Sequence, residues 1–101
     1  MQAGRELDKL VGLTLGWDVD PAGVIYRKGN MWFDLPRFST TWEGMGVLIE
    51  EARKQGILID VLAREDGYIA VWGRRWADNV KCNEAPHAVS LGFLQAKGIE
   101  I

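Results

Sequence analysis

The stretch from Phe38 to Gly98 restricts the fold most, because it holds a capped helix, a strand hairpin and a second helix with almost no residues between them. Ser39 or Thr40 is expected to cap the first of these helices. Thr40 has Glu43 three residues later, which is the spacing of a capping box. Gly56 is well placed as the residue just beyond the helix end. These boundary signals predict a mixed α and β structure.

Four runs rich in β-branched and aromatic residues predict two strand hairpins. The run Ile57-Leu58-Ile59 is apolar on both faces, which is typical of a central strand covered by helices on both sides. Pro36 ends an earlier run, because proline cannot donate to a strand ladder. The expected strands are Val24–Arg27 and Asn30–Leu35 in the first hairpin, and Ile57–Leu62 and Tyr68–Trp72 in the second.

Two further helices frame the chain. A stripe of apolar residues predicts a helix from Ala3 to about Leu13. The last helix has Pro86 in its first turn and Gly98 just beyond its end. The segment from Asp18 to Gly23 is expected to be a turn, and the polar segment from Trp72 to Asn83 an irregular loop.

The fold class that follows is α+β, in a single globular domain spanning residues 1–101. The expected order is αββαββα, with a small, mostly antiparallel four-stranded sheet and helices packed on it. A chain of 101 residues is long enough for one hydrophobic core and too short for two.

Charge and cysteine content exclude several classes of function. The net charge of −2 argues against broad, sequence-independent nucleic-acid binding, which needs a basic surface. The single cysteine, Cys82, excludes an intramolecular disulfide and fits a reducing compartment. The charged start of the chain has no apolar signal segment, and no apolar run approaches the ~20 residues that span a bilayer. A cytoplasmic protein without membrane contact is therefore expected.

The sequence offers little for catalysis. His87 is the only histidine, and its position in the first turn of a helix disfavours protonation. Cys82 lies five residues before it, so the two form either a Cys–His pair or a structural thiol beside an unrelated ring. Asp18, Asp20 and Asp34 could hold a divalent ion, although short acidic turns are usually only solvated. We therefore expect no enzyme, no catalytic residue, no metal site and no cofactor.

The strongest local cluster is the run Trp72-Gly73-Arg74-Arg75-Trp76. Two guanidinium groups between two indoles can hold phosphates or carboxylates and stack on bases. The alternative is a loop stabilised by cation–π contacts that covers the end of the sheet. Arg37 could join the same surface, depending on the strand order. The candidate partner- or ligand-binding residues are Trp72, Arg74, Arg75, Trp76 and Arg37.

Three motifs and one hairpin resemble the phage ABA sandwich domain family. They are AGRELDKLVGLTLGW at the start, FSTTW at the helix entry, DGYIAVW in the second hairpin and EAPHAVSLGFLQAKG near the end. The resemblance implies a phage or prophage origin and a fold, and it brings no catalytic role. The residues that match the family are Gly4, Leu7, Asp8, Ser39, Thr40, Trp42, Ala85, Pro86, Ala88 and Val89.

Together these features favour a non-enzymatic phage accessory protein that acts by binding. Counter-defence is the most concrete form, in which the chain inhibits a bacterial host defence protein as anti-CRISPR proteins do. A second interpretation is an oligomeric sponge for a small nucleotide immune signal, with Trp76 stacking on the base while Arg74 and Arg75 hold phosphate. A third is a structural phage protein without ligand, whose five tryptophans fill the core and a homodimer contact.

Overall fold

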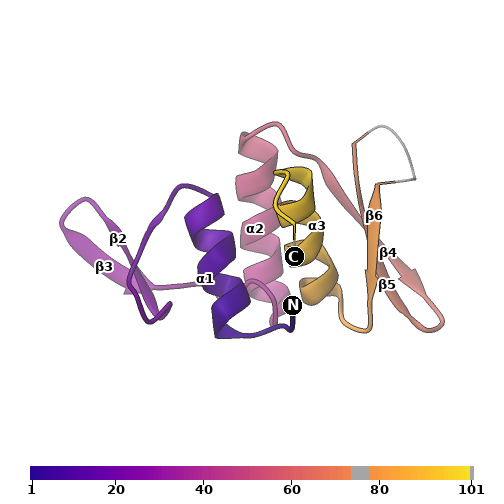
Figure 1. Cartoon of the computed structure of the whole chain (residues 1–101), viewed down its shortest axis with the longest axis horizontal. Helices are drawn as coiled ribbons and strands as arrows, with labels where there is room; N and C mark the ends of the chain where they lie inside the picture. The colour runs from indigo at the N-terminus through magenta and orange to yellow at the C-terminus, as the bar shows by residue number, and fades with distance from the viewer. Residues whose placement is uncertain (74–77, 101) are drawn as a thin grey trace.

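Three helices lie between two small antiparallel sheets in the computed structural model, which describes residues 1–73 and 78–100. The molecule is elongated, with extents of 42 × 25 × 23 Å, and the sheets form its two ends (Figure 1). The elements in chain order are α1 (Arg5–Thr14), β1 (Asp18–Val19), β2 (Ile25–Lys28), β3 (Met31–Asp34), α2 (Trp42–Lys54), β4 (Ile59–Arg64), β5 (Gly67–Trp72), β6 (Asn79–Cys82) and α3 (Ala85–Ala96).

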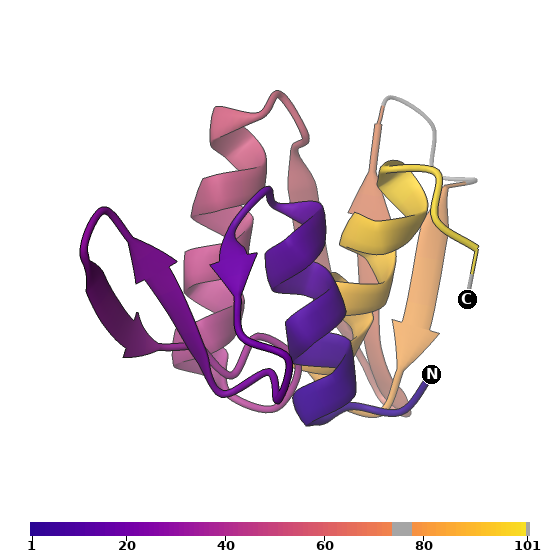
Figure 2. The same cartoon turned by 60° about the vertical axis from the view of Figure 1, so that its left-hand side comes forward.

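The expected single four-stranded sheet is wrong. The two predicted hairpins exist, but each gains a third strand and they do not pair with each other. The first sheet has the order β1-β2-β3 and the second the order β4-β5-β6. The turned view in Figure 2 shows the helices separating the two sheets. The class remains α+β, with the order αβββαβββα.

The two missed strands have weak sequence signals. β1 has only two residues and lies inside the segment predicted as a turn, where it pairs Asp18 with Arg27. β6 lies inside the segment predicted as an irregular loop and pairs with β5 from Tyr68 to Val71. Strands this short and polar are stabilised by their neighbours, so local composition does not reveal them.

The run Ile57-Leu58-Ile59 is not the central strand that its apolar pattern predicts. β4 begins only at Ile59 and, within the part of the chain that the structure describes, pairs with β5 alone, so it is an edge strand. Leu58 is 66% exposed. β5 is the central strand of this sheet, and its burial increases toward Ala70 and Val71.

The core lies between the helices and extends to one face of each sheet. α3 packs against α2 and against β5 and β6, and α1 packs against α3 and β1. Among the described elements, α1 approaches the first sheet only at β1, which leaves the β2–β3 hairpin at one end of the molecule (Figure 1). The largest fully buried side chains are Phe38, Phe93, Leu7, Leu48 and Leu94.

The start of α2 differs by one residue from the prediction. Thr41, not Thr40, is the N-cap, and its hydroxyl oxygen accepts a hydrogen bond from the Gly44 N–H at 2.9 Å. Gly44 is buried against the preceding loop: a methyl group there would lie 2.2 Å from the Arg37 carbonyl oxygen. The glycine is therefore required for the close approach of two backbone segments.

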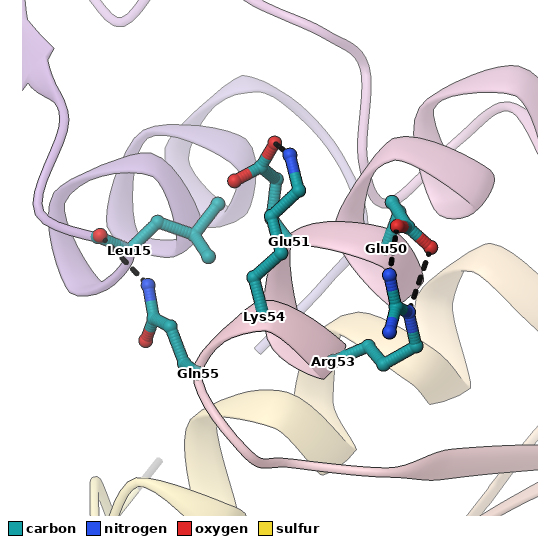
Figure 3. A network of polar contacts seen from close by, with 6 residues as sticks. All are labelled: Leu15, Glu50, Glu51, Arg53, Lys54 and Gln55. Carbon is teal, nitrogen blue, oxygen red and sulfur yellow. Dashed lines mark hydrogen bonds and ion pairs between the residues drawn. The ribbon is translucent and has the colours of Figure 1, made fainter.

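The end of α2 is tied to the end of α1. The Gln55 side chain donates a hydrogen bond to the Leu15 carbonyl oxygen at 3.0 Å (Figure 3). On the exposed side of the same turn, Arg53 pairs with Glu50 at 2.6 Å and Lys54 with Glu51 at 3.3 Å. Gly56 follows with φ of +84°, as its predicted position beyond the helix end requires. No helix in the described ranges is long and apolar enough to cross a membrane.

Candidate interaction surface

The structure separates the binding residues that the sequence suggested. Trp72 ends β5 and is half-buried, with its ring within 3.2 Å of the position that a methyl group on Gly92 of α3 would take. Its role in the described part of the chain is therefore packing of the second sheet against α3. Arg74, Arg75 and Trp76 lie outside the described residues.

Arg37 does not join Trp72. It is exposed in the connection between β3 and α2, on the side of the first sheet, whereas Trp72 belongs to the second. Arg37 instead lines a cavity of about 510 Å³ together with Arg5 and Thr40. The other lining residues are Gly4, Asp8, Gly23, Val24, Asp34 and Leu35. Both acidic and basic groups border this cavity, so its charge is mixed.

The most unusual surface is β3 itself. Met31, Trp32 and Phe33 are consecutive and are 63%, 49% and 41% exposed. We call these three residues the β3 surface. The alternation of Met31, Phe33 and Leu35 with Trp32 and Asp34 in the sequence predicts one buried face and one partly exposed face. All four residues of the strand are exposed, so this prediction is wrong for β3. Of the predicted apolar positions in this hairpin, Leu35, just beyond the strand, is the buried one.

One face of the first sheet carries a row of aromatic rings. Trp17 stacks on Tyr26 with ring centroids 4.5 Å apart, and Tyr26 lies 5.7 Å from Phe33. Trp17 also contacts the fully buried Phe38 at 5.6 Å. The row therefore connects the core to the exposed edge of the sheet, and it holds the hairpin in place through ring packing.

The opposite face carries Trp32, because neighbouring side chains on a strand point to opposite sides. Arg27 faces Trp32 across the β2–β3 pair, with its guanidinium carbon 6.0 Å from the ring centroid. The same guanidinium pairs with Asp18 on β1 at 2.9 Å. Asp18, Arg27 and Trp32 thus form a row in which an exposed indole ring packs beside an ion pair. We call this row the charged face.

Asp20 orients the strand that carries Arg27. One of its carboxylate oxygens accepts hydrogen bonds from the Val24 N–H at 2.7 Å and from the Ile25 N–H at 3.0 Å. The bond from Ile25, followed by those from Val24 and its neighbours, lowers the pKa of Asp20 below its usual range. The acidic turn considered as a cation site therefore acts in this structure as a cap for β2.

Cys82 and His87, which would form the catalytic pair that the sequence suggested, have different surroundings in the structure. Burial raises the pKa of the Cys82 thiol, which keeps it protonated. Nε2 of His87 lies 2.7 Å from the Met1 carbonyl oxygen. Within residues 1–73 and 78–100, no group of three or more histidine, cysteine or acidic side chains is arranged to hold a metal ion.

Sequence patterning missed the β3 surface. The alternation of Met31, Phe33 and Leu35 with Trp32 and Asp34 predicts burial on one side, and it does not decide which face Trp32 takes. The available signal was Pro36, which marks the end of a strand and is tolerated beside an open edge. The exposure of β3 follows from the helix contacts, because among the described strands of the first sheet only β1 is approached by a helix.

Comparison with known proteins gives a fold and no family. No protein-family model matches the chain, so the phage ABA sandwich family is not confirmed. No curated protein matches it either. A solved crystal structure of a phage protein from Bacillus cereus ATCC 14579 is similar, with a TM-score of 0.75 and 20% sequence identity. The match covers 100% of this chain and 92% of that one. The chain therefore shares the fold of a phage protein.

Proposed function

We propose that this chain is a phage accessory protein that acts by binding another protein, without catalysis, and that the β3 surface is required for this binding. The observation that carries the proposal is the exposure of Met31, Trp32 and Phe33 in sequence on an open strand. Met31 and Phe33 point to one face of the sheet and Trp32 to the other, so both faces of this strand carry exposed apolar side chains, and such side chains beside charged residues are typical of protein interaction sites.

The charged face has the composition of a binding hot spot. Tryptophan and arginine are enriched among residues that dominate binding energy, and Trp32 and Arg27 lie next to each other here. The Asp18 contact restricts the Arg27 side chain before a partner arrives. Less conformational entropy is then lost on binding, which favours affinity.

In its finer form the proposal is counter-defence: the bound protein is an immune effector of the bacterial host, in the manner of an anti-CRISPR inhibitor. The fold shared with a phage protein supports a phage origin, which counter-defence requires. The interaction would take place in the host cytoplasm, where Cys82 would stay reduced.

The test is a plating assay. Bacteria with an active CRISPR–Cas system directed against a phage would express the wild-type chain, Trp32→Ser or Trp42→Ser. Trp42 is a matched control, because it is also a tryptophan, is 57% exposed, and contacts Tyr68 near the other sheet. We expect the wild type and Trp42→Ser to raise plating efficiency and Trp32→Ser to abolish the gain.

Two results would contradict the proposal. An equal loss of the plating gain in both tryptophan variants would show that β3 has no special role. No gain with the wild type against a panel of bacterial defence systems would remove counter-defence, and binding through β3 would then need another target.

The alternative of a nucleotide sponge rests on Arg74, Arg75 and Trp76, which lie outside the described residues. It is tested by native mass spectrometry of the purified protein, in which added mass of a few hundred daltons per chain would favour it. The structural-protein alternative predicts that no variant of the β3 surface changes phage growth.

A further inference from the structure

β3 is the least protected strand edge among the described residues. Proteins usually block open edges with charged side chains, prolines or very short strands. β4 carries Asp60 and Arg64, β6 carries Lys81, and β1 has only two residues. β3 carries no lysine, arginine or proline, and its one charged residue is Asp34 at the end. This edge is therefore open to another strand.

The register of the hairpin identifies which main-chain groups face outward. The Leu35 N–H donates to the Val24 carbonyl at 2.8 Å, so Leu35 is bonded toward β2. Hydrogen-bonded and non-hydrogen-bonded pairs alternate along an antiparallel pair. Phe33 is therefore also bonded toward β2, whereas Trp32 and Asp34 direct their N–H and C=O groups away from β2. Two residues thus offer a complete set of donors and acceptors at the open edge.

We propose that β3 pairs antiparallel with β3 of a second copy of this chain, about a two-fold axis at Phe33. This inference rests on the proposed function, because it assumes that β3 is an interaction surface, and it names the occupant of its edge. In this register Trp32 of each copy is hydrogen-bonded to Asp34 of the other. The first sheets (β1-β2-β3) of the two copies then form one continuous six-stranded sheet.

The side chains of β3 suit this register. Phe33 lies opposite Phe33 of the second copy, in a non-hydrogen-bonded pair, where side chains approach most closely. The aromatic row of Trp17, Tyr26 and Phe33 then continues across the axis. Asp34 lies opposite Trp32 of the other copy, on the face where Arg27 supplies positive charge.

Other registers are poorer. A shift of one residue places an outward-facing residue opposite one that is already bonded to β2. A shift of two residues in one direction places Asp34 opposite Asp34, which repels. A shift of two residues in the other direction places Trp32 opposite Trp32 and leaves Asp34 without a partner in β3 of the other copy. The proposed register alone uses both outward residues and brings no like charges together.

Edge pairing leaves the faces of the sheet open. The two-fold axis is perpendicular to the sheet, so both copies present Trp32 and Arg27 on the same side. The dimer would therefore offer the host protein a symmetric surface with two tryptophans. The position of the hairpin at one end of the molecule leaves room for this arrangement (Figure 1).

The test is a charge exchange at the axis, followed by sedimentation equilibrium over a range of protein concentrations. Phe33→Asp and Phe33→Lys each place like charges opposite each other in a homodimer. We expect the wild type to dimerise, each variant to associate at least about tenfold more weakly, and an equal mixture of the two to dimerise again. Leu58→Asp is the control: it adds charge at an exposed position near the other sheet and should leave the dimer intact.

Circular dichroism checks that the variants fold. If both Phe33 variants lose their helical signal, Asp34→Pro decides the question, because it removes an outward N–H without removing a bond to β2. A dimer that survives Asp34→Pro, or that survives both Phe33 charges unchanged, overturns the inference.

A wild type that stays monomeric at every concentration also overturns it. The proposed function would nevertheless stand in that case if Trp32→Ser still abolished the plating gain, because β3 would then hold a host protein directly. If instead the wild type dimerises but gives no plating gain, the pairing of β3 with a second copy stands and the proposed counter-defence function fails.

Discussion

The Asp8 carboxylate accepts two hydrogen bonds from Ser39, one from its backbone N–H at 2.8 Å and one from its hydroxyl at 2.6 Å. Both residues are buried, and the Ser39 hydroxyl oxygen also accepts a bond from the Gly4 N–H at 2.9 Å. The contact joins the first turn of α1 to the connection between β3 and α2. Two of the sequence motifs, AGRELD and FSTTW, therefore meet in space, and they fix the end of β3 relative to the helices.

We expect Ser39→Ala to lower the free energy of unfolding by about 1–3 kcal/mol, because the buried Asp8 carboxylate loses a donor. Urea unfolding followed by tryptophan fluorescence measures this loss. Thr40→Ala is the neighbouring control, since the Thr40 side chain is exposed, and it should change stability by less than about 0.5 kcal/mol. Equal effects of the two substitutions would argue against the buried contact.

Two glycines of α2 should respond in opposite directions to alanine. Gly44→Ala is expected to destabilise the protein, because the methyl group would clash with the Arg37 carbonyl oxygen. Gly46 has open space around it, so Gly46→Ala should add up to about 1 kcal/mol through helix propensity. Thermal unfolding of the two variants compares them directly. A stabilising Gly44→Ala would show that the two backbones do not pack this closely.

The acid limb of stability should depend on Asp20. Its pKa is lower in the folded protein than its ordinary value of 3.8, chiefly because the Ile25 N–H donates to it. Its contribution is therefore fully present above pH 3.8 and is lost as the pH falls through the folded pKa. Asp20→Asn keeps an accepting oxygen without the charge. We expect the difference in melting temperature between wild type and Asp20→Asn to be constant near neutral pH and to shrink below pH 3.8. A difference independent of pH would contradict this assignment.

Ser90 in α3 is fully buried, and its hydroxyl has no hydrogen-bond partner among the described residues. A buried polar group without a partner costs free energy, so Ser90→Ala should stabilise the protein by on the order of 1 kcal/mol. The reverse change at a neighbouring buried position, Ala88→Ser, should destabilise it. Chemical denaturation of both variants tests the pair, and a clear loss of stability in Ser90→Ala would mean that the hydroxyl has a partner.

The sequence predicts the helices well because their signals are local. Pro86 does lie in the first turn of α3, and Gly56 follows α2 in a left-handed conformation. Sheet membership is different, because a strand pattern shows which side chains alternate and not which strand lies alongside. The apolar run at Ile57 suggested a central strand, although the neighbouring Leu58 is among the most exposed apolar residues. The error of one sheet instead of two arises from this missing long-range information.

The candidate surface was less predictable than the fold. Arginine and tryptophan favour binding, which made Arg37 and Trp72 candidates, yet Trp72 belongs to the second sheet and Arg37 to the connection that follows the first. Trp32 had the same composition signal, and its exposure depends on α1 approaching only β1. No pattern within residues 31–34 records how far a helix reaches, so the β3 surface emerges only from the assembled structure.

The central claim, that the β3 surface binds protein, is tested most directly by site-specific photocrosslinking in bacteria. A photoreactive benzoylphenylalanine would replace Trp32 in one variant and Trp42 in another, and mass spectrometry would identify what each captures. We predict one dominant product at position 32, with a second copy of the chain or a host defence protein, and none at position 42. An excess of untagged wild-type chain should displace a host-protein product, whereas a homodimer product should persist and contain the untagged chain. No product at position 32, or the same products at both positions, would contradict the claim.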